Sequence, residues 1–217
     1  MARRYDCTNS VDRTQGVAAA VAAAKRGHLV VLPAETVYGL ATDAFSMEGV
    51  NHMREVQNRT REVPIPVLIG RPNTADGLVL TLGAEGRALV EAFWPGPLTV
   101  VARAHPSLRW DIGNSHGTVS VRMPIHPLAL EVLRETGPLA LTAANRAGLP
   151  APRTIDAARE QLADDVAVYL DAGELESGLA STVVDVTEDV PRMVRAGAFT
   201  FDRLREVAPN LVDATSA

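Results

Sequence analysis

Short apolar runs alternate with helix-forming segments along most of this chain, and this alternation limits its fold more than any other feature. Residues 28–32, 66–69 and 138–142 are apolar runs of strand length, and the segments between such runs show the spacing and end signals of helices. Because helices that flank a sheet bury both elements, the sequence predicts an α/β fold, with a twisted mixed sheet and flanking helices. The 217 residues contain no repeat or linker and suffice for one domain with a sizeable core.

Local signals place the expected elements along the chain. A capping box at Asp12 and Gln15, followed by alanine-rich residues 17–26 and Gly27, indicates the first helix. Further helices are expected over residues 46–58, 81–93, 127–135, 155–162 and 201–207, with Ser46 and Thr154 as caps. Strands are expected over residues 28–32, 66–69, 98–102, 118–123, 138–142, 166–170, 182–186 and 192–194.

The composition argues against several kinds of site. Twenty of the 21 basic residues are arginines, so a mechanism that needs a lysine would have to use Lys25, which lies in no phosphate-loop motif. The one cysteine, Cys7, forms no internal disulfide, and the five histidines never stand four residues apart. We therefore expect no metal site built from protein side chains.

Hydropathy and charge limit the partners. No apolar run is long enough to span a membrane, and no apolar signal region follows the first six residues. We therefore expect a cytoplasmic protein without membrane contact. The net charge of −5 does not favour a general nucleic-acid binder, although it is compatible with a local arginine groove.

Residues 32–40 carry the most informative local pattern. A buried strand leaves the sheet at Pro33 and enters the polar pair Glu35 and Thr36, while Gly39 allows an unusual backbone turn. Domains of the α/β class build ligand crevices in this way at strand ends. The alternative is an ordinary turn after a strand, which the pattern by itself favours slightly.

Arginines and an asparagine mark two further candidate stretches. Arg59 and Arg61 follow a helix and can converge on one phosphate, although arginines at a helix end also offset its dipole. Asn145 follows an apolar strand and offers both donors and an acceptor, as a nucleotide contact requires, but Asn near Gly is also typical of turns.

A polar stripe lies on the strand expected over residues 118–123. The two-residue period of a strand places Thr118, Ser120 and Arg122 on one face. An arginine on a core strand costs free energy unless it is paired or binds an anion, so the pattern indicates either an ion pair or an anion site. Ser181 and Arg195 add another hydroxyl and another guanidinium near the end of the chain.

Six stretches together resemble the successive motifs of the YrdC-like family, whose best-known members are the threonylcarbamoyl-adenylate synthases. They are residues 33–40, 93–99, 121–124, 143–145, 181–185 and 195–197. The resemblance implies one YrdC-like domain with a concave substrate crevice over residues 13–207. It leaves residues 1–12 as an N-terminal extension and residues 208–217 as a C-terminal tail.

The resemblance also implies a reaction. A nucleotidyltransferase of this family condenses L-threonine, bicarbonate and ATP, with Mg²⁺ accompanying the nucleotide, to threonylcarbamoyl-adenylate and pyrophosphate. Partner proteins then pass the threonylcarbamoyl group to an adenosine beside the anticodon of certain tRNAs, and direct RNA contact is compatible with this role. Two alternatives stay open: a diverged paralogue acting on another carbamate, carbamoyl or adenylate substrate, and a non-catalytic module that binds a nucleotide or RNA.

The family's roles carry over residue by residue. They imply that Arg59 and Asn145 are catalytic. The implied nucleotide-binding residues are Gln57, Arg61, Thr118, Asn145 and Arg195. The implied amino-acid-binding residues are Ala34, Thr36, Arg122, Ala143 and Ser181.

Three of these positions depart from the family pattern. Gln57 stands where the usual K-x-R motif has lysine, Ala143 where S-x-N has serine, and Ala34 where P-T-[DE]-T has its first threonine. A neutral amide in place of an ammonium removes a charge-assisted hydrogen bond of about 1.5 to 3 kcal/mol. Arg61 is the nearby residue expected to supply part of that charge.

Overall fold

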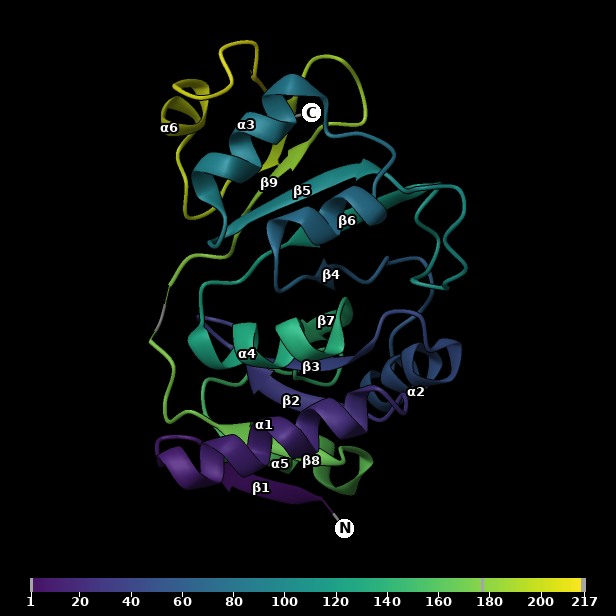
Figure 1. Ribbon diagram of the computed structural model, residues 1–217, viewed down its shortest axis with the longest axis vertical. Coiled ribbons are helices and arrows are strands. Elements are labelled where there is room, and N and C mark those ends of the chain that lie inside the picture. The colour runs from purple at the N-terminus through teal and green to yellow at the C-terminus, as the bar shows by residue number, and fades with distance from the viewer. Residues whose placement is uncertain (1, 177, 216–217) are drawn as a thin grey trace.

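The computed structural model describes residues 2–176 and 178–215 of the chain, and eleven strands form one sheet there (Figure 1). The helices are α1 (Ser10–Ala24), α2 (Met47–Gln57), α3 (Gly83–Phe93), α4 (Pro127–Thr136), α5 (Ile155–Leu162) and α6 (Phe201–Arg205), with short 3-10 helices at Pro72–Gly77 and Ala163–Asp165. The strands are β1 (Arg3–Asp6), β2 (Val30–Pro33), β3 (Tyr38–Asp43), β4 (Val67–Leu68), β5 (Leu98–Arg103), β6 (Thr118–Arg122), β7 (Leu139–Ala143), β8 (Val168–Asp171), β9 (Thr182–Asp185), β10 (Arg192–Arg195) and β11 (Val212–Asp213).

The sheet is mixed, with the strand order β1-β8-β2-β3-β7-β4-β6-β5-β9-β10-β11. β2 pairs parallel with β8 and antiparallel with β3, which pairs antiparallel with β7. The two-residue β4 joins the halves of the sheet, antiparallel to β7 and parallel to β6. The predicted fold class, a twisted mixed sheet with flanking helices, is confirmed.

Helices cover both faces of the first half of the sheet. Val30 and Leu32 of β2 pack in one apolar cluster with residues of α1 and α4, whereas Val31 packs in another with Val50 and Met53 of α2. Because successive residues of a strand point to opposite faces, α1 and α4 lie on one face and α2 lies on the other. α1 and α4 also contact each other, as Figure 1 shows.

The first helix begins earlier than its sequence signals suggest. Asn9 caps α1, because its Oδ1 accepts hydrogen bonds from the backbone N–H groups of Val11 at 2.9 Å and Asp12 at 3.3 Å. The helix therefore starts at Ser10, and the capping box placed at Asp12 and Gln15 is wrong. The Asn9 side chain, three residues before Asp12, caps the helix instead.

Strand β3 was missed, and with it the geometry of the turn that precedes it. Gly39 lies inside β3 and makes no turn: a Cβ at this position would lie 2.8 Å from Cδ2 of Leu141 in β7. The glycine is needed for close approach to that side chain. The residue with a left-handed backbone is instead Glu35, whose φ is 76°.

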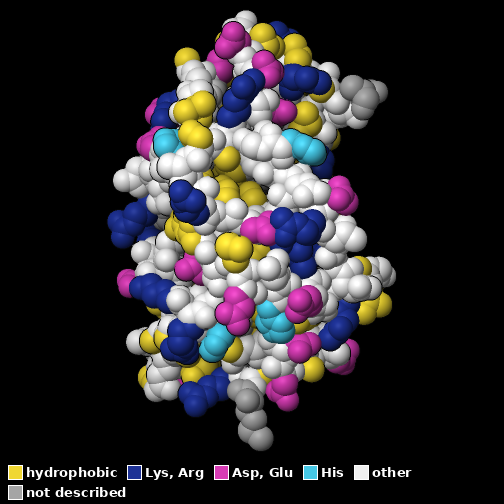
Figure 2. All heavy atoms as spheres, turned by 90° about the vertical axis from the view of Figure 1, so that its right-hand side faces the viewer, with side chains coloured by type: hydrophobic (Ala, Val, Ile, Leu, Met, Phe, Trp, Pro, Cys, Tyr) yellow, Lys and Arg dark blue, Asp and Glu magenta, His cyan; other side chains and the backbone are white. Residues whose placement is uncertain are grey.

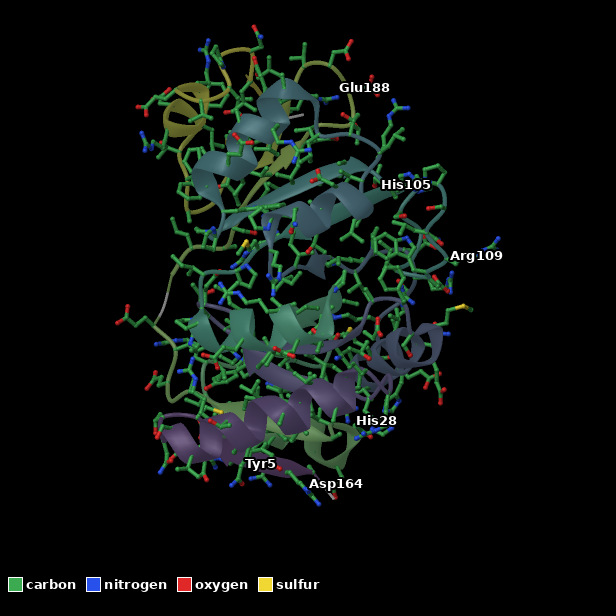
Figure 3. The ribbon with its side chains drawn as sticks, viewed as in Figure 1. Tyr5, His28, His105, Arg109, Asp164 and Glu188 are labelled. Atoms are coloured by element: carbon green, nitrogen blue, oxygen red, sulfur yellow. The ribbon has the colours of Figure 1, made fainter. Side chains whose placement is uncertain are left out.

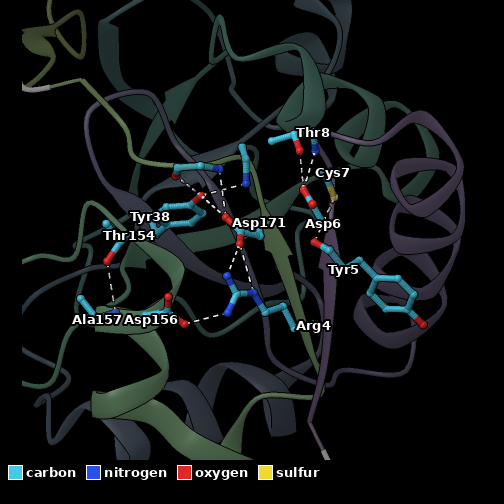
Figure 4. A network of polar contacts seen from close by, with 12 residues as sticks. Arg4, Tyr5, Asp6, Cys7, Thr8, Tyr38, Thr154, Asp156, Ala157 and Asp171 are labelled. Atoms are coloured by element: carbon cyan, nitrogen blue, oxygen red, sulfur yellow. Dashed lines mark hydrogen bonds and ion pairs between the residues drawn. The ribbon is translucent and has the colours of Figure 1, made fainter.

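Both ends of the described chain join the sheet. β1 pairs with β8, and β11 pairs with β10, so residues assigned to an extension and a tail contribute strands. Arg4 of β1 contacts Asp171 of β8 at 2.5 and 3.0 Å and Asp156 of α5 at 2.7 Å (Figure 4). The boundary expected at residue 13 falls inside α1.

Candidate active site

A cavity of about 470 Å³ lies among the central strands. Side chains from the β2–β3 turn, β5, β6, β7, β9, β10 and the end of α2 line it. Its volume is within the range typical of small-molecule sites. Of the eleven residues to which the family resemblance gave a role, seven line this cavity: Ala34, Thr36, Arg59, Arg122, Ala143, Ser181 and Arg195.

Arg122 and Glu35 form an ion pair in the cavity. Their side chains are 15% and 13% exposed, and Oε1 of Glu35 also accepts a hydrogen bond from Ile125 N at 2.7 Å. Burial, and then the nearby charge of Arg195, lower the pKa of Arg122 to about 10, so the guanidinium stays protonated at neutral pH. Arg122 is thus a buried cation whose partner comes from a strained turn.

A second group of polar side chains surrounds Ser181. The Ser181 and Thr99 hydroxyls lie 2.8 Å apart. Arg195 donates to the Ser181 carbonyl through Nη2 at 2.8 Å and through Nε at 3.1 Å, and to its Oγ at 2.9 Å. These bonds fix the start of β9 against β10, so Ser181 presents a positioned hydroxyl to the cavity.

The end of α2 supplies two further arginines. Arg54 lies in the last turn of the helix and Arg59 directly after it, and both line the cavity. The helix ends because Asn58 adopts a left-handed backbone with φ of 53°, whose N–H caps the Arg54 carbonyl. Four arginines therefore line one cavity, against a single carboxylate, Glu35, among the described lining residues.

Gln57 does not line the cavity, because its side chain lies between α2 and the end of β7. It is fully buried, and its Nε2 donates to the carbonyls of Ala143 at 2.6 Å and Asn145 at 2.8 Å. Its Oε1 accepts from the Thr142 hydroxyl at 2.6 Å. The amide thereby ties α2 to the end of β7, directly beneath the cavity residues there.

The other three expected nucleotide ligands also lie outside the lining of the cavity. Arg61 is held in a bidentate ion pair with Asp111. The Thr118 hydroxyl donates to the Ser115 carbonyl at 2.7 Å. Asn145 donates to the carbonyls of Arg146 and Leu149, while its Oδ1 is buried and finds no partner among the described residues.

Glu35, Arg54 and Thr99 are among the polar residues of this cavity that sequence reasoning missed as individual ligands. Thr99 stands between the apolar residues Leu98 and Val100 on β5, so the two-residue period of a strand puts it on the opposite face, a signal that was present in the sequence. Glu35 was seen only as part of a turn. Nothing in the sequence marked Arg54, because an arginine near a helix C-terminus is a common surface residue.

The chain is similar to known proteins in sequence and in structure. The sequence model of the family Sua5_yciO_yrdC, described as "Telomere recombination", matches residues 22–197. The chain belongs to this family. A Mycobacterium tuberculosis member, named "Putative threonylcarbamoyl-AMP synthase", is 46% identical over 216 residues, which cover 100% of this chain and 99% of the relative.

Other members of the family agree with this assignment. The threonylcarbamoyl-AMP synthase of Bacillus subtilis is 32% identical over 88% of this chain, which spans 56% of that protein. The structure of Pyrococcus abyssi Sua5 complexed with L-threonine matches with a TM-score of 0.89 and 28% identity over 100% of this chain and 63% of that chain. Escherichia coli YciO shares the fold, with a TM-score of 0.78 at 18% identity.

No group of three or more histidine, cysteine, aspartate or glutamate side chains among the described residues is arranged to hold a metal ion. None of the helices in residues 2–176 and 178–215 is long and apolar enough to cross a membrane.

Proposed function

We propose that this protein is a threonylcarbamoyl-AMP synthase, a nucleotidyltransferase that makes threonylcarbamoyl-AMP and pyrophosphate from L-threonine, bicarbonate and ATP. Relatives that bear this name support the proposal, one of them over the full length of this chain. The observation that carries it is the cavity with four arginines in a protein whose net charge is −5. Such a local concentration of guanidinium groups suits substrates with a carboxylate and several phosphates.

L-threonine is expected at the Arg122 end of the cavity. The guanidinium can bind the amino-acid carboxylate in a bidentate manner once Glu35 moves away, and the Ser181 hydroxyl lies on the same wall. Thr36, from the β2–β3 turn, contributes another hydroxyl-bearing side chain. The complex of the Pyrococcus protein with L-threonine supports this substrate class.

The nucleotide is expected to extend from this end towards Arg59 and Arg195. A carbamate oxygen of N-carboxythreonine attacks the α-phosphorus of ATP, and the bond from that phosphorus to the bridging oxygen breaks. Pyrophosphate leaves with the electron pair, and formation of the carbamate from threonine and bicarbonate releases one water. Negative charge builds on the phosphate oxygens, and preorganised guanidinium groups stabilise it. Holding both substrates in one cavity supplies the proximity.

The described lining residues of the cavity do not form a magnesium site. Glu35 is the one carboxylate among the described lining residues, and Arg122 occupies it. Mg²⁺ would therefore enter with ATP, held by its phosphates, and no protein ligand is assigned to it. Bicarbonate is the expected source of the carbamoyl carbon.

Transfer of the product to tRNA would require partner proteins, and we place the protein in the cytoplasm with them. On the face shown in Figure 2, basic and acidic side chains are interspersed, without one continuous basic patch. This face offers no broad electrostatic footprint for a nucleic acid. We propose a role in tRNA modification through the product.

A pyrophosphate-release assay tests the proposed function. Release should require L-threonine, bicarbonate and ATP together, and the variant Arg122→Gln should raise the KM for threonine by about tenfold to a hundredfold. Arg71→Gln, an exposed residue outside the cavity, is the matched control. Release that does not depend on threonine would contradict the proposal.

A different amino acid is the second candidate substrate. Ala34 and Ala143 give the cavity apolar surfaces where the family pattern has hydroxyls. Sites that lack a hydrogen-bonding partner discriminate weakly against apolar analogues. Substitution of L-valine or L-serine for threonine in the same assay decides between the two, because the true substrate gives the higher kcat/KM.

A further inference from the structure

Arg54 is an unusual residue of the cavity. Its side chain lies in the last turn of α2 and is 5% exposed. Its Nη1 makes two long contacts, each of 3.4 Å, to Asn51 Oδ1 and the Asp111 carbonyl. Its Nε and Nη2 are buried and find no hydrogen-bond partner in the described part of the chain. Burial of a charged donor without a hydrogen-bond partner costs more free energy than burial of an unpaired neutral polar group.

The charges around Arg54 do not neutralise it. Asp111 is a carboxylate whose charge acts on Arg54, but Arg61 already binds both of its oxygens. Arg59, on the same cavity wall, has a buried Nε that also lacks a partner among the described residues. Burial lowers the pKa of Arg54 and Asp111 opposes this shift, yet an arginine stays protonated. The α2 end of the cavity therefore carries an excess of positive charge.

The loop after β5 holds the guanidinium in place. Gly113 has a φ of 105°, and a Cβ there would lie 3.0 Å from Arg54 Nη2. The loop backbone thus closes over the arginine from the side of Asp111 and Gly113. Arg54 also lines the cavity, and its unpaired Nε and Nη2 are themselves buried behind the cavity wall.

The cavity has two cationic groups at different places. Arg122 and Arg195 come from β6 and β10, whereas Arg54 and Arg59 come from the end of α2. One group suits the carboxylate and the α-phosphate, where the new bond forms. The other is free for the phosphates that leave. Gln57 adds no charge here, because it is enclosed in its own hydrogen bonds.

We propose that Arg54 is a further substrate-contacting residue, which with Arg59 binds the β- and γ-phosphates of ATP and stabilises the departing pyrophosphate. The proposal rests on the proposed function for the identity of the nucleotide. The unpaired Nε and Nη2 of Arg54 form the fork that matches two phosphate oxygens. The buried charge is unfavourable in the free protein and becomes satisfied when the polyphosphate binds.

Calorimetric titration with pyrophosphate, ATP and AMP, each with Mg²⁺, tests the assignment. Arg54→Met should weaken pyrophosphate and ATP binding by about tenfold to a hundredfold and should change AMP binding by less than about twofold. Arg54→Lys should recover part of the lost affinity, because it restores the charge without the fork. Arg109→Gln is the matched control, since Arg109 lies on the exposed loop and points away from the molecule (Figure 3).

Thermal unfolding separates binding from a structural role. Because Nε and Nη2 of Arg54 lack partners among the described residues and Nη1 makes only two long contacts, Arg54→Met should leave the Tm unchanged or raise it, while the Tm increase caused by pyrophosphate should be largely lost. A lowered Tm together with unchanged selectivity for pyrophosphate over AMP would overturn the proposal and make Arg54 structural.

The same titrations distinguish this inference from the proposed function. Selective loss of pyrophosphate binding in Arg54→Met supports the residue assignment even where the wild-type protein makes no threonylcarbamoyl-AMP. Wild-type synthesis with unchanged pyrophosphate and ATP affinities in Arg54→Met refutes the assignment and leaves the function intact. Absence of pyrophosphate and ATP binding to the wild-type protein refutes both.

Discussion

Glu35 and Arg122 form an ion pair at the place in the cavity where the substrate carboxylate is expected to bind. The glutamate reaches this position from a left-handed backbone conformation, with a φ of 76°, in the turn between β2 and β3. Such a conformation costs about 1 to 3 kcal/mol in a residue other than glycine, so the turn is one that substrate binding can rearrange. The Glu35 side chain thus pairs with the Arg122 guanidinium, and the proposed threonine site requires the substrate carboxylate to displace it.

The first prediction follows from this competition. Glu35→Gln should bind L-threonine about fivefold more tightly, because the neutral amide is displaced more easily than the carboxylate. The same variant should have a lower Tm, since it leaves Arg122 buried without an opposite charge. Calorimetry and thermal unfolding measure the two effects, with Glu160→Gln on the exposed side of α5 as control. Weaker threonine binding would mean that Glu35 contacts the substrate directly.

Gln57 is predicted to be a determinant of stability. Gln57→Leu removes the two donors that satisfy the Ala143 and Asn145 carbonyls and the acceptor for Thr142. The free energy of unfolding should fall by about 2 to 4 kcal/mol, because buried polar groups are left unpaired. Urea denaturation measures this change. The control Gln15→Leu, at an exposed position of α1, should change the free energy of unfolding by less than about 0.5 kcal/mol. A loss below about 1 kcal/mol for Gln57→Leu would show that the network contributes little.

His126 is predicted to make stability depend on pH. Burial, and then the charge of Arg13, lower the pKa of His126 from its ordinary value of 6.5. The unfolded chain therefore binds a proton at a pH where the folded protein does not, and stability is lost as the pH falls below about 6.5. Urea midpoints between pH 7.5 and 5 should fall less in His126→Asn than in the wild-type protein. The control is His116→Asn at an exposed site, and equal slopes in all three proteins would refute the assignment.

Cys7 is predicted to be unreactive in the folded protein. Burial raises the pKa of its thiol to about 11, and the thiolate is the reactive form. At pH 8, iodoacetamide should alkylate the folded protein about a hundredfold more slowly than the urea-unfolded protein. Mass spectrometry gives both rates without ambiguity, because Cys7 is the single cysteine. Similar rates in the two states would show that the thiol is open to solvent.

Local signals were sufficient for much of the fold. Caps and apolar spacing placed α2 and α5, and the alternation of β6 correctly put Ser120 and Arg122 on one face. The sequence signals did not predict β3, because Gly39 is a poor strand former. Glycine is required at this position by the side chain of Leu141, which lies in a strand distant in sequence. Contacts far apart in sequence override local propensity in this way.

The candidate site was likewise predicted only in part from the sequence. The motifs led to Arg122, Ser181 and Arg195, which do line one cavity. They gave no sign that Gln57 is enclosed by carbonyls of the β7 segment, or that Arg61 is paired with Asp111. Burial and pairing are properties of the packed chain, so they could not be derived from residue types and spacing.

Detection of the product tests the central claim most directly. The purified protein is incubated with L-threonine, ATP, Mg²⁺ and ¹³C-labelled bicarbonate, and the products are analysed by mass spectrometry. The proposed function predicts threonylcarbamoyl-AMP with the label in its carbamoyl carbon, in amounts that match the pyrophosphate released. No labelled adenylate, under conditions in which the Bacillus subtilis relative forms it, would contradict that function.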